Sequence, residues 1–174
     1  RQAMIKSLGK NINVVEMRGN INTRLKKLKN SNIDGIILAK AGLRRMEMDS
    51  LITQNLSVES FVPSPGQGVL CIECLSQHSE IMSKIKKIVH LNTEICVSAE
   101  RIFAAQMDGD CMSPIGAHAT IQKDLITITG FVATADGTRY IRNKIEGNKN
   151  NYKDLSTKLS NLFIKMGSKG MLKC

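Results

Sequence analysis

Two of the three prolines and two of the glycines fall within six residues, Pro63-Ser64-Pro65-Gly66-Gln67-Gly68. Proline restricts φ and glycine frees it, so a cluster of this kind marks a stiff turn or an interdomain crossing. The 174 residues are enough for one full domain or two small ones. We therefore expect residues 1–62 and 90–174 to be separate structural blocks, with residues 63–89 as a crossing segment between them.

The first block alternates between strand and helix patterns. Residues 13–17 and 33–39 are predicted strands, the second apolar enough to be buried on both faces. Asn20 is a good N-cap for a helix whose apolar positions are Ile21, Leu25 and Leu28. Short helices are expected at 41–46 and 49–54. This alternation favours an α/β layer with parallel strands.

The crossing segment contains one predicted strand, residues 69–74, and one helix. One strand and one helix cannot bury a core alone, so we expect this segment to expose apolar surface. The side chains concerned are Ile72, Ile81, Ile85 and Ile88.

The last block is predicted to be a small α+β domain, an antiparallel sheet with helices on one face. Strands are expected at 117–122, 125–132 and 139–146, with turn residues between them. A helix capped by Asn92 or Thr93 precedes them. Its expected buried stripe is Ile95, Ala99, Ile102 and Phe103. A final helix, ended by Gly167, has a stripe made of Leu155, Leu159, Leu162 and Met166.

Charge and composition restrict the compartment and the partners. No apolar run approaches the length of a membrane helix, and no secretory signal is visible. Five cysteines are too few for a disulfide scaffold and fit a reducing compartment. These observations favour the cytoplasm. A net charge of +10 suits either nucleic acid or a small polycarboxylate. Aromatic residues are only 3% of the chain, and this disfavours the binding of single-stranded nucleic acid by base stacking.

Two loops have the pattern of an anion site. Arg18 and Arg24 flank Gly19, where a strand end leads into a helix N-terminus with free backbone N–H groups. Ala41-Gly42-Leu43-Arg44-Arg45 repeats this arrangement after the second predicted strand. Arginine grips carboxylates and phosphates through two parallel bonds, although solvated arginines at ordinary turns would give the same pattern.

The cysteines suggest different roles. Cys71 and Cys74 have CxxC spacing without a second ligand pair, so we expect buried structural cysteines and no metal site. Cys111 stands in a polar loop, Asp108-Gly109-Asp110-Cys111-Met112-Ser113-Pro114, and is a candidate for an accessible thiol. Such a thiol could be a covalent attachment point or an incidental loop residue.

These motifs, taken in order, resemble hydroxymethylbilane synthase, also called porphobilinogen deaminase. The matching segments are Arg18-Gly19-Asn20 with Thr23-Arg24, Asp34 to Ala39, Ala41 to Arg45, Pro65 to Gly68, Ile72-Glu73-Cys74, Ala99-Glu100-Arg101 and Pro114-Ile115-Gly116. The resemblance implies part of a periplasmic-binding-protein-like parallel-sheet domain (residues 1–62, the family's second domain). A return segment of the first domain (63–89) and a cofactor-attachment domain (90–174) would follow it.

The resemblance also implies a function in tetrapyrrole (haem) biosynthesis. The family condenses four porphobilinogen units into hydroxymethylbilane and releases ammonia, on a dipyrromethane cofactor held by a thioether. Cys111 matches the attachment cysteine, whereas Arg18, Arg24, Arg45 and Arg1 match arginines that bind pyrrole carboxylates, and Gln67 resembles a residue lining the cleft. The expected partners are porphobilinogen and the growing pyrrole chain, not nucleic acid or membrane, and the complete family enzyme is expected to be a monomer.

Two departures from the family pattern are visible. Asp110 stands where the family usually has glycine before the cysteine. The chain also begins partway into the second domain, so the family's catalytic aspartate has no match and no catalytic residue is nominated. We therefore expect this piece to be inactive alone. The rival interpretations are a basic RNA-binding module and a non-catalytic remnant.

Overall fold

The computed structural model describes residues 1–9, 11–108 and 113–172. Its contacts divide the chain into two compact units. The larger unit comprises Arg1–Ile12 and Val58–Cys174, and the smaller comprises Asn13–Ser57. The domain boundaries expected from the family resemblance stay a prediction.

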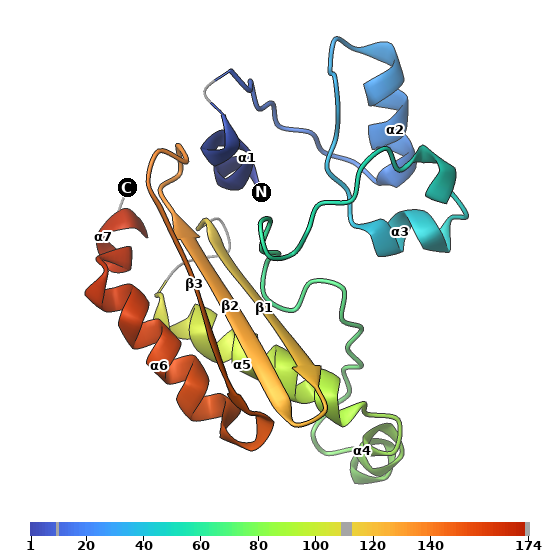
Figure 1. Cartoon of the computed structure of the whole chain (residues 1–174). Helices are drawn as coiled ribbons and strands as arrows, with labels where there is room; N and C mark the ends of the chain where they lie inside the picture. The colour runs from blue at the N-terminus through green and yellow to red at the C-terminus, as the bar shows by residue number, and fades with distance from the viewer. Residues whose placement is uncertain (10, 109–112, 173–174) are drawn as a thin grey trace. The chain divides into compact units, whose positions relative to one another are not determined.

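A three-stranded antiparallel sheet forms the centre of the larger unit (Figure 1). Its strands are β1 (Ile115–Gln122), β2 (Leu125–Ala133) and β3 (Tyr140–Asn148), in the order β1-β2-β3. In this register Ile128 lies opposite both Ala119 and Ile145. All three strands predicted for this block are confirmed, with small shifts at their ends.

Two long helices, α5 (Leu91–Gln106) and α6 (Tyr152–Lys165), pack against one face of the sheet (Figure 1). Phe103 and Phe163 meet edge to face with ring centroids 4.9 Å apart. The other buried members of this core are Ala99, Met107, Ala117, Ala119, Ile126, Ile128, Val132, Ile141, Leu155, Leu159 and Met171. The predicted α+β arrangement is therefore confirmed for this part of the chain.

Details of these helices differ from the predictions. The N-cap of α5 is His90 and not Asn92 or Thr93, and the His90 Nδ1 atom lies 2.7 Å from the Thr93 Oγ1 atom. In α6 the buried stripe continues from Leu159 to Phe163, so Leu162 and Met166 are exposed. Gly167 follows with a φ of +88°, as expected of a helix stop. After it comes α7 (Ser168–Leu172), and η2 (Lys149–Asn151) links β3 to α6.

The opposite face of the sheet is covered at one end by α1 (Gln2–Leu8), a helix that the sequence pattern did not predict. Neighbouring residues of a strand point to opposite faces, so Phe131 and Ala133 face away from the core that contains Val132. They form a second core cluster with Ala3, Met4 and Val62. The prediction that helices cover only one face of the sheet was thus incomplete, because α1 covers part of the other face.

Many apolar side chains of the segment from Val69 to Leu91 are exposed to solvent. It contains α4 (Ser79–Lys86), but the strand predicted at 69–74 is not formed. Leu70 is 75% exposed, Ile72 59% and Ile88 69%, whereas Ile85 is half-buried. The expected apolar surface is confirmed for Ile72, Ile81 and Ile88, and it was wrong for Ile85.

The smaller unit contains α2 (Ile21–Asn30), α3 (Lys40–Arg45) and a short 3-10 helix, η1 (Asp49–Leu51). Asn20 caps α2 as predicted, because its side chain accepts a hydrogen bond from the Thr23 amide at 2.8 Å. The strands predicted at 13–17 and 33–39 are not formed. A strand requires a paired neighbour, and neither segment has strand pairing within the described residues. The expected parallel sheet is therefore not present in the part of the chain that the structure describes.

Candidate functional site

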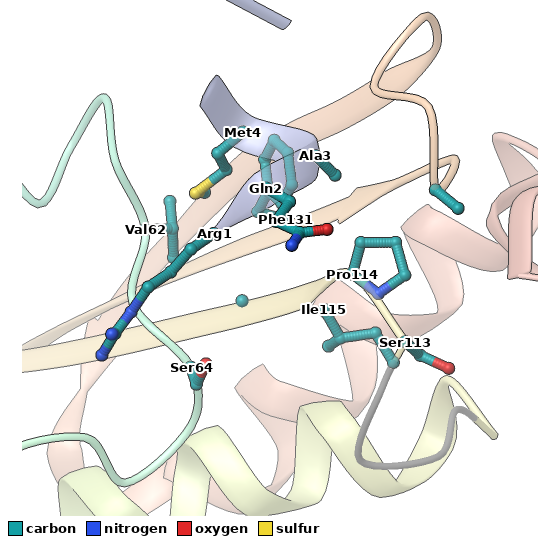
Figure 2. A pocket seen from close by; sticks show the side chains of 12 residues that line it. Arg1, Gln2, Ala3, Met4, Val62, Ser64, Ser113, Pro114, Ile115 and Phe131 are labelled. Carbon is teal, nitrogen blue, oxygen red and sulfur yellow. The ribbon is translucent and has the colours of Figure 1, made fainter. Parts of the chain in front are cut away.

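A pocket of about 410 Å³ opens in the larger unit between the start of α1, the segment around Val62 and the approach to β1 (Figure 2). Its lining combines apolar side chains with a few polar groups, which is the usual composition of a small-molecule site. The lining residues are Arg1, Gln2, Ala3, Met4, Val62, Ser64, Ser113, Pro114, Ile115, Gly116, Phe131 and Ala135. One predicted binding residue, Arg1, is among them.

The floor of the pocket depends on a close approach of two backbone segments. The Ala117 amide donates a hydrogen bond to the Pro63 carbonyl oxygen at 2.9 Å. At Gly116 a Cβ atom would lie 2.9 Å from the Val62 carbonyl oxygen and 3.2 Å from that of Pro63. A side chain at Gly116 would push these segments apart, so the glycine permits the contact between the 62–63 segment and β1.

The turn predicted from Pro63 to Gly68 forms and brings two predicted site residues together. Gly66 and Gly68 have φ values of +71° and +87°, in the region that favours glycine. The Gln67 amide donates to the Ser64 carbonyl oxygen at 3.0 Å. The Arg1 Nη2 group donates to the Gln67 Oε1 atom at 3.2 Å, so the Gln67 side chain is bonded to a residue of the pocket wall.

A buried carboxylate lies behind this turn. Glu100 of α5 is 6% exposed, and its Oε2 atom accepts a hydrogen bond from the Gly66 amide at 2.7 Å. Its Oε1 atom accepts from the Ala119 amide at 2.8 Å and lies 3.7 Å from the His118 Nδ1 atom. Burial raises the pKa of Glu100, while the bonds from Gly66 and Ala119 and the nearby His118 act in the opposite direction. The sequence analysis placed Glu100 in a family motif but did not predict a buried carboxylate that accepts backbone hydrogen bonds. The position of Glu100 directly after Ala99, on the predicted buried stripe, could have indicated it.

The predicted attachment residue Cys111 and its neighbour Asp110 lie outside the described residues. The next described residues, Ser113 and Pro114, line the pocket. Pro114 also accepts a hydrogen bond from the Ala133 amide at 3.1 Å through its carbonyl oxygen. The segment from Ser113 onward is therefore held at the pocket edge by β2.

In the smaller unit, Arg18 and Arg24 both lie at the N-terminus of α2. The Arg24 Nε group donates to the Gly19 carbonyl oxygen at 2.7 Å, and the Lys27 Nζ group donates to that of Arg18 at 3.2 Å. Arg18 itself is exposed and pairs with Glu16 at 2.9 Å. A helix N-terminus carries partial positive charge, so three cationic side chains add to it here.

The start of α3 lies close to the start of α2. A Cβ atom on Gly42 would lie 2.7 Å from the Ile21 Cδ1 atom. Arg45 is in the last turn of α3, and its neighbour Arg44 pairs with Asp49 at 3.1 Å. The two loops with the anion-site pattern are thus adjacent through Ile21 and Gly42. That the Arg18, Arg24 and Arg45 guanidinium groups converge on one ligand stays a prediction.

The remaining cysteines differ in part from expectation. Cys71 is exposed and Cys74 is half-buried, so the prediction of two buried structural cysteines was wrong. The segment that carries them forms no strand and joins neither core cluster of the described residues, which explains their exposure. Within residues 1–9, 11–108 and 113–172, no three His, Cys, Asp or Glu side chains are grouped as metal ligands would be.

None of the helices that the structure describes is long and apolar enough to cross a bilayer.

Comparison with known proteins adds an assignment for both halves of the chain. The family model described as "Porphobilinogen deaminase, dipyromethane cofactor binding domain" matches residues 1–83, and the model described as "Porphobilinogen deaminase, C-terminal domain" matches residues 94–165. The chain belongs to the porphobilinogen deaminase family. The first match contains Arg1, Arg18, Arg24, Arg45 and Gln67, and the second contains Cys111.

Individual members of the porphobilinogen deaminase family align along almost the whole chain. A porphobilinogen deaminase of Clostridium botulinum (strain Kyoto / Type A2) is 40% identical over 165 residues, which is 95% of this chain and 56% of the relative. Those of Pelotomaculum thermopropionicum and Trichlorobacter lovleyi are 37% and 34% identical, over 93% and 99% of this chain and 52% and 55% of the relatives. The chain therefore spans about half the length of the curated relatives it matches.

Proposed function

We propose that this chain acts in tetrapyrrole biosynthesis as part of a deaminating transferase that condenses porphobilinogen units into hydroxymethylbilane. In each condensation an unsubstituted pyrrole carbon of one unit bonds to the aminomethyl carbon of another. The C–N bond of that aminomethyl group breaks, and the amine leaves as ammonia with the proton that the pyrrole carbon releases. The cytoplasm is the proposed compartment, and porphobilinogen and the growing pyrrole chain are the proposed ligands. Family membership supports the reaction class.

The observation that carries this proposal is the pocket of the larger unit. It brings Arg1, Ser64, Ser113 and Phe131 to the lining of one cavity of about 410 Å³. A pyrrole with acetate and propionate groups has a flat apolar ring and two anionic arms, and this lining offers a partner for each. Arg1 is in addition bonded to Gln67, which orients its guanidinium.

A dipyrromethane group, when bound, supplies the primer on which pyrrole units are added. The chain's own residues fit such a group. The proposed thioether residue is Cys111, two residues before Ser113 of the pocket lining. Arg1 and Gln67 would hold a carboxylate of the group, and the contact between Pro63 and Ala117 keeps the pocket floor in place.

A second anion-binding element is proposed in the smaller unit. Arg18, Arg24 and Arg45 would bind carboxylates near the adjacent starts of α2 and α3. Arg18 is exposed and pairs with a surface glutamate, so an anionic ligand could replace Glu16 at little cost. Each bond between charged groups is worth about 1.5–3 kcal/mol.

Two measurements test the proposal. Calorimetric titration of the 174-residue chain with porphobilinogen should show weaker binding for Arg24→Gln and Arg45→Gln by roughly tenfold or more. Lys29→Gln, which removes the same charge from the last turn of α2, is the matched control and should change binding little. Equal losses in all three variants would mean that only overall charge attracts the ligand.

The thiol assignment needs intact mass. The chain, joined to the part of the Clostridium botulinum relative that it does not match, should gain the mass of a dipyrromethane when incubated with porphobilinogen. Cys71→Ser, at an exposed cysteine, should load as the parent does, and Cys111→Ser should not load. An adduct that persists in Cys111→Ser overturns the assignment, and an adduct absent from the parent as well contradicts loading at a loop that carries Asp110.

A further inference from the structure

Glu100 links three parts of the larger unit through one buried side chain. It belongs to α5, and its two carboxylate oxygens accept hydrogen bonds from Gly66 in the turn and from Ala119 in β1, at 2.7 Å and 2.8 Å. An ionised acid is expensive to bury unless hydrogen bonds satisfy it, and two backbone amides do so here.

From this geometry we infer that Glu100 is a positioning residue: its carboxylate sets the place of the Gly66–Gln67 turn and thereby orients Gln67 toward Arg1. The turn is held at both ends. The Pro63 carbonyl oxygen is bonded to the Ala117 amide at one end, and the Gly66 amide is bonded to Glu100 at the other.

Gln67 is the residue on which this positioning acts. It follows Gly66 directly, and its Oε1 atom holds the Arg1 guanidinium at 3.2 Å. Local bonds shape the turn around Gln67, because the Gln67 amide donates to the Ser64 carbonyl oxygen and the Val69 amide donates to that of Gly66. The place of the turn against α5 and β1 depends in addition on the tertiary bonds of Pro63 and Gly66. The consequence for ligand binding in the pocket rests on the proposed function, whereas the positioning itself does not.

Among the described residues, few ionisable groups face Glu100. His118 of β1 lies 3.7 Å from it, and Cys96 of α5 has its pKa raised by burial and, to a smaller extent, by the charge of Glu100. The Pro63–Gly68 turn contains no ionisable residue. A pH titration of the turn should therefore report Glu100, modulated by His118.

The first test is a pH titration of the ¹⁵N-labelled chain by NMR. We expect the amide protons of Gly66 and Ala119 and the side-chain amide of Gln67 to shift together, with one midpoint above 4.5. The transition should persist in His118→Gln and in Glu94→Gln, an exposed acid of the same helix, and should vanish from all three reporters in Glu100→Gln. The inference is overturned if, in the wild-type chain, the side-chain amide of Gln67 does not shift with the same midpoint as the Gly66 amide. This comparison uses the wild-type chain alone, so it does not depend on whether a variant folds.

The second test measures binding of porphobilinogen. Glu100→Gln should weaken binding about tenfold while Glu94→Gln leaves it within about twofold, and binding by the wild-type chain should weaken as pH falls through the NMR midpoint. Unchanged binding by Glu100→Gln, with the Gly66 shift lost, would show that the turn does not orient the pocket and would overturn the inference. If the wild-type chain does not bind porphobilinogen, the proposed function fails, and the NMR titration alone decides the role of Glu100.

Discussion

Gly137, in the turn between β2 and β3, lies directly against the backbone of α1, where a Cβ atom would be 2.5 Å from the Ala3 carbonyl oxygen. Its φ is +73°. We predict that Gly137→Ala destabilises the chain by about 2–4 kcal/mol, the combined cost of left-handed backbone and of overpacking. Denaturant unfolding measures this loss.

Gly167→Ala is the matched control for that prediction. Gly167 also has a positive φ, +88°, but a Cβ atom added there would have none of the described atoms within 4 Å. It should therefore lose only the backbone contribution, about 1–2 kcal/mol. Equal losses at both glycines would mean that the contact between the turn and α1 contributes nothing, and the pocket wall formed by α1 would not depend on it.

The sheet core makes a similar prediction at Gly130. A Cβ atom at Gly130 would lie 2.5 Å from the Phe103 Cζ atom, and the Phe103 side chain is itself fully buried. Gly130→Ala should cost about 1–3 kcal/mol because the ring cannot move without disturbing Phe163. Combining it with Phe103→Leu should cost less than the sum of the two single changes, and strict additivity in a double-mutant cycle would contradict the contact.

Ser156 offers a stabilising change. Its hydroxyl oxygen is fully buried in α6 and has no hydrogen-bond partner in the part of the chain that the structure describes. Ser156→Ala should raise the free energy of unfolding by about 1 kcal/mol, because an unsatisfied polar group is removed and alanine favours helix. Ser160→Ala, which removes a bonded hydroxyl one turn later, should instead be neutral or destabilising. A loss of stability in Ser156→Ala would indicate a partner for that hydroxyl.

Glu100 predicts a pH dependence of stability. Since burial raises its pKa in the folded chain, the folded state binds its proton more tightly than the unfolded state does. Its contribution to stability is fully present below pH 4.5 and is lost as pH rises through the folded pKa. The free energy of unfolding of the wild-type chain relative to Glu100→Gln should therefore fall as pH rises above 4.5 and through the folded pKa of Glu100. A difference that rises with pH over this range would contradict the raised pKa.

The apolar segment near α4 should govern association. Leu70 and Ile88 are 75% and 69% exposed, so replacing either by serine removes little buried area. Leu70→Ser and Ile88→Ser should reduce hydrophobic-dye binding and concentration-dependent association, and should change the unfolding free energy by no more than about 0.5 kcal/mol. Wild-type chain that stays monodisperse and dye-free at high concentration would refute the prediction.

Local sequence signals predicted the larger unit better than the smaller one. The sheet follows from period-two patterns and turn residues, because its strands pair with their neighbours in sequence. The stripe from Ala99 to Phe103 follows from helical spacing alone. The strands at 13–17 and 33–39 were wrong, since pattern shows that a segment can pair but not that a partner is present. The short helix α1 was missed because Ala3 and Met4 are buried in a cluster with the distant Phe131.

The site was predictable to a similar extent. Arg1 and Gln67 came from the family resemblance, and the structure joins them by a hydrogen bond. The role of Glu100 required knowledge that residues 66 and 119 approach the same carboxylate, which no local pattern contains. The carboxylate ligands proposed for Arg18, Arg24 and Arg45 remain to be tested by binding.

The contacts on β1 also affect how the protein resists misassembly. An open strand edge is a template on which further strands can add, and this is a common route to aggregation. On β1 the amides of Ala117 and Ala119 are already bonded to the Pro63 carbonyl oxygen and to the Glu100 carboxylate. An incoming strand would have to displace a proline-containing turn and leave a buried charge without its donors. The same bonds that place Gln67 thus protect this side of the sheet from edge-to-edge polymerisation.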